Sequence, residues 1–213
     1  PYAMPVFFYA GIYMGLIAVH DQLSDRVWTE LAVSEDTKTW ERIEKGTPLI
    51  PCSEEPLDYD YGCVYACASP VFLKNEIRLY YGGSDWLHFG WRKGCLALAT
   101  LRPDGFAGYV QEKRNETAKI GTESFFTKKG VIKISADIER DGLLSVRLLS
   151  PAGDLVKEAR LDQSCVDFDL FTSLPDHDAR YRIEFELHAA KLYSFTIEDR
   201  VPGEKKLQAA KTS

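Results

Sequence analysis

The sequence predicts an all-β protein, and three observations support this prediction. Apolar and polar residues alternate with a period of two over most of the chain, as they do from Ile132 to Ile138. No stretch of useful length carries the apolar periodicity of an amphipathic helix. Aromatic residues make up 12% of the 213 residues, and such side chains suit the surface of a pleated sheet.

The first half of the chain contains an internal repeat. The residues MPVF at 4–7 recur as SPVF at 69–72, and at the same offset of 65 Ile12 corresponds to Ile77. Each repeat has the pattern of a strand, a turn, a strand, a polar loop, a third strand and a closing strand. A four-stranded unit that recurs at roughly 40–65 residues is typical of a β-propeller blade.

We therefore divide the chain into three parts. Residues 1–115 are predicted to form two antiparallel propeller blades, with inner strands at 2–9 and 62–73 and no helix between 60 and 110. Residues 116–200 are predicted to form an antiparallel β-sandwich, and 201–213 a tail without an apolar face. Two blades are too few to close a ring.

The sandwich prediction depends on alternation and turn signals in the second half. Asp141-Gly142 follows one alternating run and precedes another, so it is predicted to form a tight hairpin. Two further alternating runs occupy 181–187 and 191–198. The expected core residues are Ile132, Ile134, Leu144, Val146, Ile183, Phe185, Tyr193 and Phe195.

Composition excludes several classes of function. The formal net charge is −6 and no basic block is present, so nucleic acid is not an expected partner. The most apolar stretch, 4–19, is too short to span a membrane and reads as two buried strands. The five cysteines form no CxxC pair and only four histidines are present, so neither a metal site nor a cofactor is predicted. Pro1 is not a start methionine, and we expect an upstream segment.

Several phrases together resemble a known family. They are YAMPVFFYAGIYMGL, DRVWTELAVSEDTKTWERI, DYGCVYACASPVF, IRLYYGG and LALATLRPDGFAGY. This set resembles the last two blades of the five-bladed β-propeller in glycoside hydrolase family 32 and its relatives, the invertases, levanases and arabinanases. The later RYRIEFELHAAKLYSFTIED is similar to the accompanying sandwich, so the resemblance covers about 1–199.

The resemblance implies a carbohydrate ligand, an extracellular or secretory location, and a partner that is either the missing N-terminal blades or another chain. It implies no catalytic residue here, because the family's carboxylates lie in Asn-Asp-Pro, Arg-Asp-Pro and Glu-Cys contexts that this sequence lacks. We expect the isolated chain not to hydrolyse glycosides.

Five residues are candidates for substrate binding. Asp60 and Tyr61 precede an inner strand, while Asp85, Trp86 and His88 occupy the loop after the IRLYYGG strand. Tryptophan can stack on a sugar ring, and the polar groups can bond its hydroxyls. The alternatives are a turn aspartate at position 60 and tryptophans that pack between blades.

Two functions remain open from the sequence. The first is part of a glycoside hydrolase that acts on a furanoside-type or related oligosaccharide, with the catalytic carboxylates outside this chain. The second is a non-catalytic carbohydrate-binding or adhesion protein on a degenerate propeller scaffold. A glycoside phosphorylase is more distant, because the sequence shows no cluster of cations for phosphate.

Overall fold

The computed structural model describes residues 1–127, 130–172, 174 and 179–198, and the predicted tail at 201–213 lies outside this part. Within the described residues the protein is all-β and contains no helix, as predicted. Accordingly, no helix in this part of the chain could cross a membrane. The chain divides into two compact units, Pro1–Ala107 and Gly108–Ser213.

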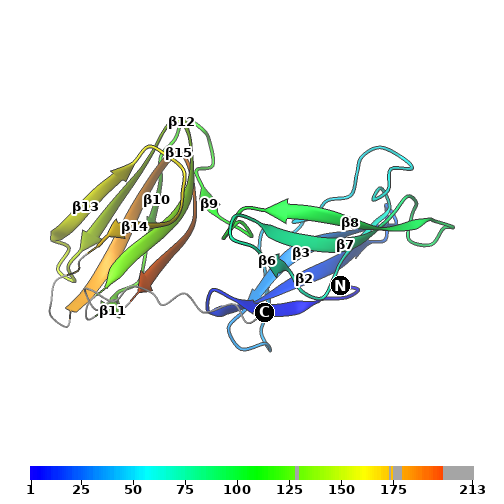
Figure 1. Cartoon of the computed structure of the whole chain (residues 1–213), viewed down its shortest axis with the longest axis horizontal. Coiled ribbons are helices and arrows are strands. Elements are labelled where there is room, and N and C mark those ends of the chain that lie inside the picture. The colour runs from blue at the N-terminus through cyan, green and yellow to red at the C-terminus, as the bar shows by residue number, and fades with distance from the viewer. Residues whose placement is uncertain (128–129, 173, 175–178, 199–213) are drawn as a thin grey trace, which may run out of the picture. The chain divides into compact units, whose positions relative to one another are not determined.

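The first unit begins with four antiparallel strands in chain order, of which Figure 1 labels β2 and β3. These strands are β1 (Val6–Tyr9), β2 (Ile12–Asp21), β3 (Arg26–Ser34) and β4 (Glu41–Arg42). Backbone bonds continue the β1–β2 pairing to Tyr2, whose N–H donates to the Ala18 carbonyl at 2.8 Å. Of the segment 2–9 that was predicted to be a strand, Val6–Tyr9 is strand, and an isolated bridge joins Ala3 to Ala18.

A second group of strands follows the repeat. The group comprises β5 (Cys63–Ala66), β6 (Val71–Phe72), β7 (Ile77–Ser84) and β8 (Gly94–Leu101). Both β5 and β6 pair with β7, and β7 pairs with β8. The predicted inner strand at 62–73 is thus present in two pieces, with Pro70, which has no N–H to donate, between them.

The two groups differ in their last strand. The closing strand expected after β8 does not join it among the described residues, since β9 (Tyr109–Val110) pairs with β15 of the second unit instead. One parallel bridge, Val27 to Cys63, connects the groups. Their shared core contains Leu16, Leu31, Ile50, Val64, Ile77, Leu79, Tyr81 and Phe106.

Two long strands dominate the second unit. Figure 1 shows β12 (Val131–Leu149) and β15 (Ala179–Glu198) side by side, and they pair antiparallel from Val131 opposite Glu198 to Leu149 opposite Arg182. The other strands flank them: β13 and β14 pair with β12, and β10 and β11 with β15. Their bounds are Ala118–Gly121 (β10), Phe125–Thr127 (β11), Leu155–Leu161 (β13) and Cys165–Phe171 (β14).

The predicted hairpin at Asp141-Gly142 is wrong. Strand β12 runs through this dipeptide without reversing, and its register with β15 shifts between Ile138 and Leu143. Asp141 does adopt the positive φ that the sequence indicated, at 67°. A β-bulge and a two-residue hairpin use the same backbone conformation, so the local signal did not distinguish them.

The predicted core of the second unit is correct for six of its eight residues, which are buried. Tyr193 is half-buried, and Phe195 is 37% exposed although its ring lies 5.6 Å from that of Phe185. The register of β15 with β12 shifts twice in this stretch: around Ala189, where φ is 45°, and again between Leu192 and Ser194. The inward positions therefore change from odd to even, which buries Leu192, and then return to odd, where Ile197 packs against the core.

The cysteines differ sharply in accessibility, and all five are thiols. Cys52 and Cys63 are buried, Cys67 and Cys95 are exposed, and Cys165 is intermediate. Burial raises the pKa of the Cys52 thiol to about 11. At pH 8 only about one Cys52 thiol in a thousand is then ionised, and the thiolate is the reactive form.

We expect a chromogenic disulfide reagent at pH 8 to modify two thiols quickly in the native protein, and all five after denaturation. A Cys67→Ser/Cys95→Ser variant should lose the fast phase while its total in denaturant falls to three. A fast phase of unchanged amplitude in that variant would contradict the assignment.

Candidate functional site

The loop between β7 and β8 presents two tryptophans to solvent. Asp85 closes the base of the loop: its N–H donates to the Lys93 carbonyl at 3.2 Å, and its Oδ1 accepts from the Lys93 N–H at 2.7 Å. Between these anchors Trp91 is fully exposed and Trp86 is 38% exposed. Large exposed indoles on an anchored loop are typical of a ligand-binding surface.

These residues line a groove with a volume of about 490 Å³. We call it the tryptophan groove; it is lined by Leu57, Asp85, Trp86, Trp91, Arg92 and Lys93. The indoles offer flat apolar faces, the Arg92 and Lys93 side chains carry donors, and the Asp85 carboxylate accepts. Such a lining can stack on the apolar face of a sugar and bond its hydroxyl groups.

The other predicted residues near the groove have different contacts. Asp60 is buried and its carboxylate accepts a hydrogen bond from the Tyr81 hydroxyl at 2.7 Å. Burial and hydrogen bonding raise the pKa of Tyr81 well above its usual range, so this hydroxyl stays a donor. The ring centres of Tyr61 and Trp86 are 6.0 Å apart, and the Arg26 guanidinium lies 4.8 Å from the ring centre of Tyr61. Asp60 thus supports the strand beneath, and Tyr61 supports Trp86.

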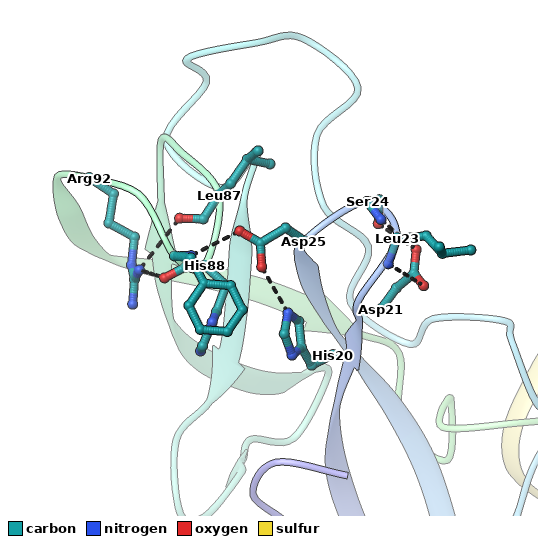
Figure 2. A network of polar contacts seen from close by, with 9 residues as sticks. His20, Asp21, Leu23, Ser24, Asp25, Leu87, His88 and Arg92 are labelled. Carbon is teal, nitrogen blue, oxygen red and sulfur yellow. Dashed lines mark hydrogen bonds and ion pairs between the residues drawn. The ribbon is translucent and has the colours of Figure 1, made fainter.

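His88, the last predicted residue, belongs to a second polar cluster. Figure 2 shows Asp25 between the His20 ring and the loop at Leu87 and His88. The Asp25 Oδ1 lies 3.0 Å from the His20 Nε2, and its Oδ2 accepts from the Phe89 N–H at 2.9 Å. The His88 N–H donates to the Asp25 carbonyl at 2.9 Å.

Sequence reasoning missed His20 and Asp25. His20 occupies an ordinary position near the end of β2, and Asp25 lies in the β2–β3 turn. His88 is far from both in the sequence, so no motif or spacing joins the three. Their convergence follows from the packing of the two strand groups.

The electrostatics of this cluster favour a charged Asp25. Burial by itself raises the pKa of the carboxyl, but the hydrogen bonds from the Phe89 N–H and His20 and the nearby imidazoles outweigh it. The net result is a pKa below the ordinary value. The His20 and His88 ring centres are 4.5 Å apart, and Tyr2 lies edge-on to His88 at 5.1 Å. Two imidazoles and a carboxylate are a donor set that divalent transition metals accept.

Comparison with known proteins finds a weak structural neighbour and no matching family. The sequence matches no described protein family, and it matches no curated protein. A solved structure named "Glycoside hydrolase" is similar, with a TM-score of 0.30 and 10% sequence identity. The alignment covers 92% of this chain and 59% of the other chain. The chain therefore spans less than two thirds of that weak structural neighbour, and a likeness at this level carries no functional argument.

Proposed function

We propose that this chain is part of a carbohydrate-active protein and that the tryptophan groove binds a neutral saccharide, furanoside-type or related. The observation that carries the proposal is the pair of exposed indoles, Trp86 and Trp91, beside one carboxylate and two cations in a single concavity. Sugars present apolar C–H faces and a rim of hydroxyls, and this groove offers partners for both.

The groove by itself supports binding rather than cleavage. Glycoside hydrolysis requires two carboxyl groups that flank the scissile bond, about 5–5.5 Å apart in retaining enzymes. Of the described residues that line the groove, only Asp85 carries a carboxylate, and the Lys93 N–H already bonds to it. We propose that any catalytic carboxylates lie outside this chain. A non-catalytic carbohydrate-binding or adhesion protein is the alternative.

The scaffold that we propose is two blades of a five-bladed β-propeller followed by a β-sandwich. The same order of pairing in β1–β2–β3 and in β5/β6–β7–β8 supports the blades. We also propose that missing N-terminal blades or another chain cover this unit, in an extracellular or secretory location. Exposed apolar side chains support a covering partner: Val6 and Phe8 on β1, and Leu96 and Leu98 on β8.

Saccharide titrations followed by tryptophan fluorescence and calorimetry test the proposal. We expect one or more oligosaccharides of a neutral panel to bind, and Trp91→Ala to weaken binding about 10-fold or more, because loss of a stacked indole costs upwards of about 1.4 kcal/mol. The matched control is Leu23→Ala, which removes an equally exposed apolar side chain outside the groove. Equal affinity in Trp91→Ala and Leu23→Ala would refute the assignment of the groove.

A further inference from the structure

We propose that His20, Asp25 and His88 bind one divalent transition-metal ion of the zinc class, through two imidazole nitrogens and one carboxylate oxygen. One ligand atom from each residue lies within 4.8 Å of the other two. The residues come from the end of β2, the β2–β3 turn and the loop after β7. This site is separate from the tryptophan groove, and its metal binding can be measured without a saccharide.

The distances suit a tetrahedral ion. Bonds of about 2.0–2.1 Å to nitrogen and oxygen place tetrahedral ligands about 3.3 Å apart. The His20 Nε2 and Asp25 Oδ1 are 3.0 Å apart, close to that separation. The other separations are at most 4.8 Å, so binding would have to bring the His88 nitrogen closer to the other two ligands. Three protein ligands leave a fourth position for water or for a ligand.

The surroundings orient the ligands before any ion arrives. The Phe89 N–H bonds the Asp25 Oδ2, which turns Oδ1 toward His20. The His88 N–H bonds the Asp25 carbonyl, so the two loops are held together through their backbones. Hydrogen bonds that orient a ligating carboxylate in this way are the usual second layer of a metal site. The side chains of His20 and Asp25 are only 13% and 20% exposed.

His88 supplies an independent observation. Its Nδ1 is buried and has no hydrogen-bond partner in the described part of the chain. A buried ring nitrogen without a partner is costly and calls for an explanation. Arg92 does not meet this need, because its guanidinium donates to the Leu87 and His88 carbonyl oxygens. A nearby ion would make use of the imidazole that the protein leaves unsatisfied.

Bound metal would clamp the β2–β3 turn to the loop that carries Trp86 and Trp91. Tyr2 and Phe89 pack around the imidazoles, with Phe89 4.7 Å from His88 and 5.6 Å from His20. We therefore expect Zn²⁺ to raise the melting temperature of the protein.

The test is titration of the untagged, chelator-treated full chain with Zn²⁺, followed by calorimetry, thermal melting and the visible absorption of a Co²⁺ substitute. We expect one equivalent to bind, with a tetrahedral Co²⁺ spectrum. His20→Gln should weaken binding ~10-fold or more, and so should His88→Phe, which keeps a ring in place but removes both nitrogens. The control is His188→Gln, which removes an exposed histidine from β15 and should change nothing.

Circular dichroism shows whether His20→Gln and His88→Phe are folded, and either variant tests the proposal if the other does not fold. Undiminished one-equivalent binding in a folded His20→Gln or His88→Phe would overturn it. So would the absence of Zn²⁺ binding at millimolar metal, which would mean that His20 and Asp25 form only the hydrogen bond seen in Figure 2. Equal weakening by His188→Gln would likewise show binding elsewhere.

Discussion

Replacing Gly62 with alanine should displace the β7–β8 loop and remove saccharide and Zn²⁺ binding together. A Cβ at this position would lie 1.7 Å from the Trp86 carbonyl oxygen and 2.1 Å from its carbon. These are backbone atoms, so no side-chain rotation relieves the overlap. Gly62 cannot retreat either, because its N–H bonds the Ser84 carbonyl and its own carbonyl accepts from the Val27 N–H, both at 2.9 Å.

The expected cost of Gly62→Ala is about 2–4 kcal/mol of unfolding free energy, since overpacking against backbone forces the loop from the strand. Denaturant unfolding and the two binding assays measure the effect. Gly82→Ala is the matched control: its Cβ would have no neighbour within 4 Å, and it lies nearby on β7. A Gly62→Ala protein as stable and as competent as Gly82→Ala would show that the loop packs differently.

Arg42→Met should destabilise the first unit by about 3–5 kcal/mol, because it leaves a buried charge without its partner. The Glu30 side chain is completely buried, and its carboxylate accepts from the Trp28 Nε1 at 2.7 Å and from the Arg42 Nε at 2.9 Å. Burial raises the pKa of Glu30, but hydrogen bonds from Trp28 and Arg42 outweigh it and bring the pKa below its ordinary 4.5. The methionine keeps the apolar stem while it removes the guanidinium.

The sign of the pH dependence follows from that lowered pKa. The carboxylate of Glu30 stabilises the wild type fully above pH 4.5, and this contribution is lost as the pH falls through the lower folded value. In Arg42→Met the buried carboxyl takes up a proton more readily, so the deficit relative to wild type should shrink in acid. Urea unfolding at pH 7 and near pH 4 checks both statements.

Arg78→Met provides the control for Arg42→Met. Arg78 pairs with Glu76 at 2.7 Å, but both side chains are more than a third exposed, at 40% and 35%. An exposed pair of this kind contributes about 0–1 kcal/mol. Equal losses in the two variants at pH 7 would mean that burial of Glu30 is not the source of the effect.

Local patterns in the sequence determined the fold class and much of the strand layout. Period-2 alternation requires only neighbouring residues, and it correctly predicted an all-β protein and six of eight core positions in the second unit. The offset of 65 residues correctly aligned β1 with β6 and β2 with β7, because equivalent strands need equivalent apolar faces. In the loop after β7 the sequence suggested Asp85, Trp86 and His88 as candidates for substrate binding but did not suggest Trp91, which also lines the groove.

Other features depend on contacts between residues that are distant in the sequence, and only the tertiary structure decided them. The bulges at Asp141 and Ala189 are set by pairing between β12 and β15, and they decided that β12 does not reverse and that Leu192 is buried. Asp60 is buried and accepts a hydrogen bond from Tyr81 on β7, a partner 21 residues away in the sequence. His20 and His88 lie close together because the two strand groups that carry them pack against each other. Each of these features depends on contacts between separate segments of the chain. The residue types involved occur in several environments, so no local sequence pattern could predict the contacts.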